Sequence, residues 1–213
     1  MKKTILILLS LPVLFSGAAL SAQELYLMPS FEEGVVYFTK QAPARGKLNI
    51  FAVDQSLRFL DDNGKELEAT NIDDVVRVVI DTVSFLRKDN AFYRLYPVSR
   101  GMGVAFKRKI ELLTGAKVEA YGTVSQTSSV TEYKTLHTSS GTYSLEGTDL
   151  PPYNEKTSLF FYEGNSLYPA NKKGLKKLFP DRKDEIEAYL KAGHRIPGTL
   201  PELIGFLDEF TKE

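Results

Sequence analysis

Short apolar runs that alternate with polar positions recur along most of the chain, and turn residues separate them. Their period is two residues, as in a strand, and β-branched and aromatic residues fill them. Strands are predicted over residues 34–39, 47–53, 56–60, 75–80, 83–86, 91–96, 102–112, 159–162 and 166–168. Because a short turn rather than a helix follows each run, the pattern is typical of an antiparallel meander.

The clearest hairpin signal is the Asn63-Gly64 pair, which follows Asp61 and Asp62. Asn-Gly accepts the positive φ angles of a type I′ turn, so we predict a tight turn of that type here. Calcium loops also use Asp, Asn and Gly, but the alternating oxygen ligands and the closing glutamate of such a loop are missing. The sequence therefore predicts a turn at this point and no metal site.

After residue 170 the period changes to that of helices. Apolar residues recur at helical spacing in two groups: Ile186, Tyr189 and Leu190, then Leu200, Leu203, Leu207 and Phe210. Asp181 is the expected N-cap of the first helix and Gly193 its end, while Thr199 and Glu202 have the spacing of a capping box. Such short helices need a docking surface. The predicted fold class is mainly β (α+β): an antiparallel β-meander, as a curved sheet or partial barrel, with two or three short C-terminal helices.

Residues 122–148 have a different composition, since about half of them are Ser or Thr. We expect an exposed hairpin with its tip at residues 139–141, and a binding loop is the alternative. The predicted organisation is a leader at 1–22, an antiparallel β domain at 23–170 that includes this segment, and a helical tail at 171–213 docked on the sheet.

The N-terminal residues have the pattern of a secretory signal peptide. Lys2 and Lys3 precede an apolar run over residues 5–15, and small residues follow up to Ala22. The run is too short for a membrane anchor, which needs about 20 apolar residues. We expect cleavage after Ala22, with Gln23 as the new N-terminus, while Ser21 is the alternative. The chain has no cysteine, so a lipoprotein is not expected, and the predicted location is periplasmic or secreted, with no integral membrane segment.

The amino-acid composition excludes several classes of function. Lys plus Arg and Asp plus Glu number 27 each, and removal of the leader would leave a slightly acidic protein, so nucleic acid is not an expected partner. The lack of cysteine excludes disulfides, thiolate metal sites and thiol redox chemistry. We expect no cofactor and no metal, and stability must come from the apolar core.

No catalytic residue is nominated from the sequence. The two histidines, His137 and His194, have no catalytic setting, and no nucleophile elbow, phosphate-binding loop, dinucleotide fingerprint or zinc spacing occurs. Structural roles are therefore expected for both histidines. The rings of the central strands are the candidate ligand surface, represented by Tyr93, Tyr96 and Phe106.

Two regions resemble a family of exported proteins of Bacteroidetes-type bacteria that has no known activity. One is residues 172–189, with the Leu-Phe-Pro-Asp step at 178–181, and the other is the β-rich stretch 35–113. The resemblance implies an envelope or secreted location and no established activity. Asp81-Thr82-Val83 also looks like the O-glycosylation acceptor of such bacteria, which implies Thr82 as a candidate modification site.

These observations predict an exported cell-envelope or secreted protein that acts as a non-enzymatic binding or assembly module. Its partner would be another envelope protein, a glycan or an apolar ligand. Two alternatives stay open. A periplasmic carrier of a lipid or other apolar molecule would hold a continuous apolar cavity with few charges. A glycan hydrolase would place two carboxylates roughly 5 to 10 Å apart in a cleft.

Overall fold

The computed structural model describes residues 24–70, 72–112 and 153–212, together with the backbone of four short strands between residues 117 and 144. The strands of the main sheet are β1 (Glu32–Phe38), β2 (Ala44–Phe51), β3 (Ser56–Leu60), β4 (Glu66–Glu68), β5 (Val75–Ile80), β6 (Val83–Lys88), β7 (Ala91–Ser99), β8 (Met102–Leu112), β13 (Tyr153–Glu163) and β14 (Ser166–Pro169). The short strands are β9 (Lys117–Val118), β10 (Val124–Ser125), β11 (Thr135–Thr138) and β12 (Gly141–Ser144). The helices are α2 (Lys172–Leu178), α3 (Lys183–Lys191) and α4 (Leu200–Lys212), with 3-10 turns η1 (Ile72–Asp74) and η2 (Pro180–Arg182).

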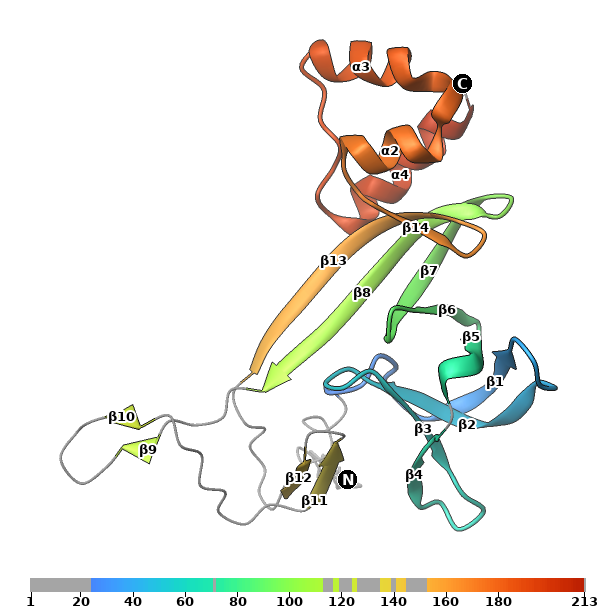
Figure 1. The fold of residues 1–213 in the computed structure, drawn as a ribbon, viewed down its shortest axis with the longest axis vertical. Coiled ribbons are helices and arrows are strands. Elements are labelled where there is room, and N and C mark those ends of the chain that lie inside the picture. The colour runs from blue at the N-terminus through green and yellow to red at the C-terminus, as the bar shows by residue number, and fades with distance from the viewer. Residues whose placement is uncertain are drawn as a thin grey trace, which may run out of the picture.

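The main sheet has ten antiparallel strands in the order β14-β13-β8-β7-β6-β5-β1-β2-β3-β4. It is curved and not closed, and the three helices lie at the end of it that carries β14 (Figure 1). The predicted fold class is confirmed. One departure from a simple meander is that β5 pairs with β1 rather than with β4. The chain therefore starts in the middle of the sheet, runs to the β4 edge, and returns through η1 to build the other half.

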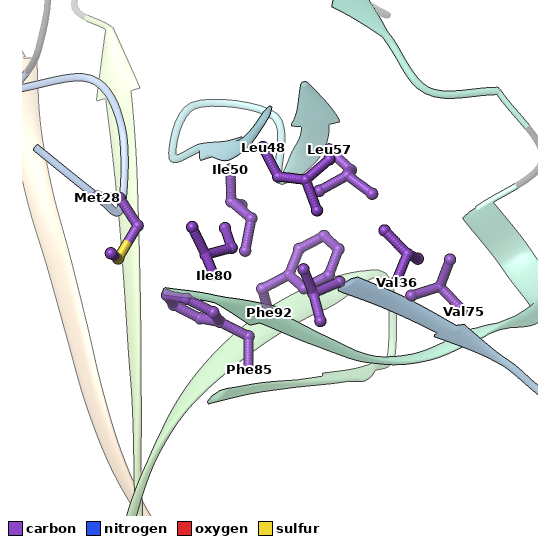
Figure 2. Packing of buried hydrophobic residues seen from close by; sticks show 10 residues of the cluster. Met28, Val36, Leu48, Ile50, Leu57, Val75, Ile80, Phe85 and Phe92 are labelled. Atoms are coloured by element: carbon purple, nitrogen blue, oxygen red, sulfur yellow. The ribbon is translucent and has the colours of Figure 1, made fainter. Parts of the chain in front are cut away.

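The curl of the sheet encloses one apolar core, with side chains from six strands pointing toward one another in Figure 2. Its buried members are Met28, Val36, Leu48, Ile50, Leu57, Val75, Val78, Ile80, Phe85 and Phe92. Phe85, Phe92, Val78, Ile50 and Ile80 are fully buried. Without any disulfide, removal of this apolar surface from water is the main source of stability for this part of the chain.

The N-terminal residues of the described chain hold the curl in place. Leu27 N–H donates to Ile50 O at 2.9 Å and Ala52 N–H donates to Leu25 O at 2.7 Å, so this segment lies along the end of β2. On the far side of the curl, Ile110 N–H of β8 donates to Ala52 O at 3.0 Å. One backbone hydrogen bond thus joins β8 to the residue that follows β2, a strand far from it in the sheet order.

A second core lies between the helices and the sheet. Val104 of β8 and Phe161 of β13 face buried residues of all three helices: Leu175, Leu178, Ile186, Leu203, Leu207 and Phe210. The apolar stripe of α4 is therefore covered by the sheet, as expected for helices too short to be stable alone. The helical tail is docked on the sheet.

The start of α4 agrees with the prediction from the sequence, whereas the start of α3 differs from it. α4 begins at Leu200, directly after Thr199, whose hydroxyl donates to the carboxylate of Glu202 at 2.7 Å. Asp181, however, does not cap α3. It lies inside η2, because Pro180 fixes its own φ and starts a 3-10 turn, and the N-cap position falls to Arg182.

The β3–β4 hairpin is confirmed, but its turn is not type I′. Asn63 does not have a positive φ, and only Gly64, with φ +76°, enters the left-handed region there. The carboxylate of Asp61 accepts hydrogen bonds from the backbone N–H groups of Asn63 (2.9 Å) and Lys65 (2.8 Å). This Asx-type arrangement stabilises a longer loop and holds Asn63 out of the conformation that a two-residue turn needs.

Several predicted features lie wholly or partly outside the described residues. The leader, with the cleavage site at Ala22 and Gln23, lies outside them altogether. Within the Ser/Thr-rich segment 122–148, β11 pairs with β12, with Thr138 opposite Gly141, and the positions of this segment outside the short strands, including two of the three predicted for the hairpin tip, lie outside the described residues. Among the described helices, none has both the length and the apolar character needed to cross a bilayer.

Candidate ligand-binding site

A row of four side chains crosses four strands on the face of the sheet that carries the helices. The strand register places Phe85 of β6 opposite Arg94 of β7, Arg94 opposite Phe106 of β8, and Phe106 opposite Leu159 of β13. Residues directly opposite in adjacent strands project from the same face. Arg94 is thus a cation between two aromatic rings, on a face whose neighbouring positions are apolar.

The three ring residues nominated from the sequence do not share one groove. Tyr96 and Phe106 lie on the helix-bearing face, where Tyr96 packs against the second core. Tyr93 lies on the opposite face, with its ring edge-on to Phe160 at a centroid distance of 5.3 Å and Lys107 Nζ above it at 5.7 Å. Successive residues of a strand point to opposite faces, which separates position 93 from position 96. Burial of its ring raises the pKa of Tyr93.

A cavity of about 370 Å³ lies beside this row, between β8, β13 and the segment that leads into α4. Its lining residues are Phe106, Thr157, Ser158, Leu159, Ala170, Pro197, Gly198, Thr199 and Leu200. The lining combines apolar side chains and an aromatic ring with three hydroxyl-bearing residues. A volume of this size lies within the range of about 300–1,000 Å³ that is common for small-molecule sites.

The edge of β13 adds backbone hydrogen-bonding groups next to the cavity. β13 pairs with β8 along all of its eleven residues, whereas β14 covers its other edge only from Phe160 to Glu163. In the part of the chain that the structure describes, no strand covers that edge from Tyr153 to Ser158. Thr157 and Ser158, which line the cavity, belong to this stretch. A ligand in the cavity could therefore also bond to the peptide groups of a rigid strand.

A smaller cavity of about 90 Å³ shares Phe106 with the larger one and is lined by Leu27, Phe85, Arg94, Phe106 and Arg108. The two arginines differ in their partners. Arg108 is 2.9 Å from the carboxylate of Glu155 and donates to the carbonyl oxygen of Tyr26 at 3.0 Å. For Arg94 the described residues provide no hydrogen bond or ion pair, and its guanidinium lies 5.3 Å from the centroid of the Tyr96 ring.

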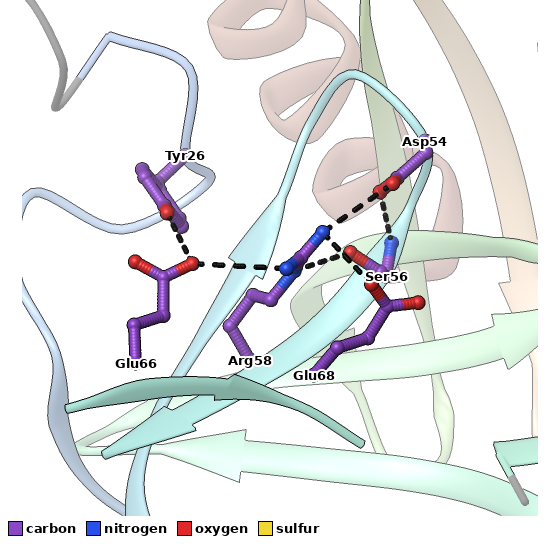
Figure 3. Close-up of polar contacts among 6 residues, drawn as sticks. All are labelled: Tyr26, Asp54, Ser56, Arg58, Glu66 and Glu68. Carbon is purple, nitrogen blue, oxygen red and sulfur yellow. Dashed lines mark hydrogen bonds and ion pairs between the residues drawn. The ribbon is translucent and has the colours of Figure 1, made fainter. Parts of the chain in front are cut away.

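The strongest cluster of charges lies elsewhere, at the β3–β4 edge of the sheet (Figure 3). Arg58 of β3 is 9% exposed, and three carboxylates surround it: Glu68 at 3.0 Å, Asp54 at 3.5 Å and Glu66 at 4.0 Å. Tyr26 donates its hydroxyl to Glu66 at 2.7 Å, and burial together with this carboxylate raises the pKa of Tyr26. The cluster joins the N-terminal segment, the β2–β3 turn and the edge strand, so its evident role is structural.

Groups suited to catalysis or metal binding do not converge at these cavities. Neither lining contains a carboxylate or an imidazole. Over the described ranges, no three His, Asp or Glu side chains are arranged to hold a metal ion. His194 stacks on Tyr189 at 4.3 Å, beyond the end of α3, and His137 lies in β11, whose side chains are outside the described residues.

Thr82 lies in the turn between β5 and β6, where it is exposed. Its hydroxyl donates to the carboxylate of Asp81 at 3.2 Å, and Asp81 has a positive φ of +52°. Burial in a strand would have blocked modification, and the turn avoids that. Glycosylation of Thr82 stays a prediction that this accessible position permits.

Comparisons of the whole chain with protein-family models, with curated proteins and with solved structures find no match. The likeness of residues 172–189 and 35–113 to an exported family therefore stays a prediction. Most of the cavity lining was missed from the sequence, because Pro197 and Leu200 meet β13 only after the tail docks. Arg94 carried a usable signal, since it stands between Phe92 and Tyr96 on one face of an otherwise apolar strand.

Proposed function

We propose that the protein is a non-enzymatic binding module of the cell envelope or the secreted space, and that its ligand is a saccharide held in the cavity beside Phe106. The observation that carries this proposal is the lining of that cavity. It places an aromatic ring, hydroxyl-bearing residues and a strand edge that no other described strand covers around a volume of about 370 Å³.

This combination suits a sugar ring for a physical reason. A sugar has C–H faces that pack on an aromatic or aliphatic side chain, and hydroxyls that need hydrogen-bond partners at its rim. Phe106, Leu159 and Leu200 supply the apolar surface. Thr157 and Thr199 carry hydroxyls, and the open edge of β13 adds peptide groups. Polar groups of a buried ligand lose affinity when they stay unpaired, so this mixture favours a saccharide over a purely apolar molecule.

The predicted signal peptide supports the proposed location, and the composition of the cavities bears on the two alternatives. A carrier of apolar ligands is expected to have a continuous apolar cavity, whereas the two cavities that Phe106 lines contain hydroxyl-bearing residues in one case and arginines in the other. A glycan hydrolase needs paired carboxylates, which neither lining contains. Binding without catalysis is the function these side chains support best.

The test is a titration of the isotope-labelled protein, residues 23–213, with a panel of neutral and acidic disaccharides, followed by NMR. Resonances of the cavity lining should shift first. Phe106→Ala should weaken binding about tenfold, because the loss of an aromatic contact costs roughly that factor. Phe160→Ala is the matched control, since Phe160 is an aromatic residue of the adjacent strand on the opposite face. If no disaccharide shifts the lining, or if both variants bind equally, the proposal fails.

A further inference from the structure

We infer that Arg94 binds a carboxylate of the ligand, so that the saccharide is an acidic one that contains a uronic-acid unit. This inference rests on the proposed function, because it names the class of saccharide that the same site takes. It follows from the place of a single cation within the row Phe85, Arg94, Phe106 and Leu159.

The position of Arg94 is the first step. Adjacent strands lie about 4.8 Å apart, so Arg94 is one strand away from Phe106, the ring shared by the two cavities, and two strands from Leu159 in the larger cavity. Arg94 lines the smaller cavity, and Phe106 belongs to the lining of both cavities. A ligand that packs on Phe106 can therefore place one substituent near Arg94 while its body occupies the larger cavity.

The electrostatic balance of the smaller cavity is the second step. Arg108, the other cation there, is engaged by Glu155 at 2.9 Å and by the carbonyl oxygens of Glu24 and Tyr26. Arg94 has an aromatic neighbour in Tyr96 and, in the described chain, no carboxylate. Among the described residues, one positive charge of this cavity thus has no counter-charge beside apolar walls. A ligand that brings one negative charge gains more there than it would in water.

The shape and charge of the anion are the third step. A guanidinium presents parallel N–H donors that match the two oxygens of a carboxylate. A phosphate monoester carries nearly two negative charges and would need a second available cation, and the Arg108 charge is already balanced by Glu155. A single carboxylate balances Arg94 alone. The geometry therefore favours a uronic acid over a sugar phosphate.

The test uses two matched probes, methyl glucuronide and methyl glucoside, which differ in that a carboxylate replaces a hydroxymethyl group. Isotope-labelled protein is titrated with each, and dissociation constants are taken from the shifts of the cavity resonances. The wild type should bind the glucuronide about tenfold more tightly, as expected for one charge-assisted contact in a partly dry site. Arg94→Gln should abolish that preference, and Arg94→Lys should retain only part of it.

Arg77→Gln is the control for charge and fold, because Arg77 pairs with Leu86 on the opposite face and its loss changes the net charge equally. This variant should keep the preference. If both sugars bind at the cavity with equal affinity, or if Arg94→Gln keeps the preference, the role of Arg94 is overturned and the binding module stands. If neither sugar nor any disaccharide of the panel shifts the lining, the proposed function fails together with this inference.

Discussion

The side-chain oxygen of Gln55 accepts a hydrogen bond from the backbone N–H of Phe92 at 3.1 Å, although 37 residues separate the two positions. The amide nitrogen of Gln55 donates to Ala52 O and to Arg108 O, each at 3.0 Å. Gln55 is 4% exposed and has a φ of +60°. One neutral side chain in the β2–β3 turn thus joins that turn to β7 and β8 and holds the curl of the sheet.

Gln55→Glu should destabilise the fold by about 2–3 kcal/mol at pH 7, since a carboxylate cannot donate to the two carbonyl oxygens and faces them with its own charge. The pKa of the introduced carboxyl would be raised in the folded state. The protonated carboxyl keeps one hydrogen-bond donor. The stability that this donor contributes is fully present below the unfolded pKa and is lost as pH rises through the folded pKa. Urea unfolding at pH 4 and pH 7 measures how much unfolding free energy the variant recovers at the lower pH. Gln55→Ala should show no comparable recovery, and equal losses at both pH values for Glu would contradict the prediction.

Arg58→Met should cost about 3 kcal/mol of unfolding free energy. The substitution leaves Asp54, whose side chain is 9% exposed, without its nearby cation, and it removes the guanidinium from above the Phe51 ring. Glu66 and Glu68 are about 40% exposed and reach water, which limits the loss. Arg45→Met, at an exposed position of β2, should change stability by less than about 0.5 kcal/mol. Similar small effects for both variants would show that the charge cluster contributes little to the free energy of unfolding.

Gly174→Ala and Gly205→Ala should have opposite effects, although both lie in helices. A Cβ at position 174 would lie 1.9 Å from the carbonyl oxygen of Pro169, so α2 must move away from β14, at a cost of about 1–3 kcal/mol. At position 205 in α4 nothing lies within 4 Å, and alanine should stabilise the helix by about 0.5–1 kcal/mol. Thermal unfolding of the two variants shows whether the Tm of each falls or rises relative to the wild type. A stabilised Gly174→Ala would contradict the close packing of α2 on β14.

The carboxylate of Glu187 should titrate unusually low. Hydrogen bonds from Lys172 at 2.8 Å and from Lys176 lower its pKa to about 2. Because the folded pKa lies below the unfolded one, this contribution to stability is present above about pH 4.3 and is lost as pH falls toward 2. NMR titration of the Glu187 side chain measures the value. In the double variant Lys172→Met/Lys176→Met, the pKa of Glu187 should return toward its ordinary range. An unchanged pKa would exclude the two lysines as the cause of the low value.

Local features of the chain were predictable because their causes are local. The strands at 56–60, 75–80 and 102–112 have the predicted bounds, since β-branched residues and turn residues act on their own segment. α4 begins where Thr199 and Glu202 indicated. Of the three rings nominated as candidate ligand contacts, Tyr96 and Phe106 lie on the helix-bearing face and Tyr93 on the other, and their role in binding stays a prediction. The type of the turn at Asn63 was predicted wrongly, because the hydrogen bonds that the Asp61 carboxylate accepts from backbone N–H groups override the preference of the Asn-Gly pair.

The periodicity of the sequence does not show which distant segments pair with one another. The pairing of β1 with β5, rather than of β4 with β5, depends on which apolar faces meet, and any one strand has the same pattern in either arrangement. Likewise β13 extends back to Tyr153 over polar positions, because β8 supplies a partner for each of them. An exposed polar stretch shows no apolar alternation from which that extension could be inferred.

The sequence by itself determined the period of each element, most turn positions, the mainly β class and the capped C-terminal helix, because these follow from backbone preferences over a few residues. Only the tertiary structure decided that Arg94 lies beside Phe106, that Pro197 and Leu200 meet β13, and that Gln55 reaches Phe92. These relationships depend on strand register and helix docking, which the whole core selects together through the surface it buries.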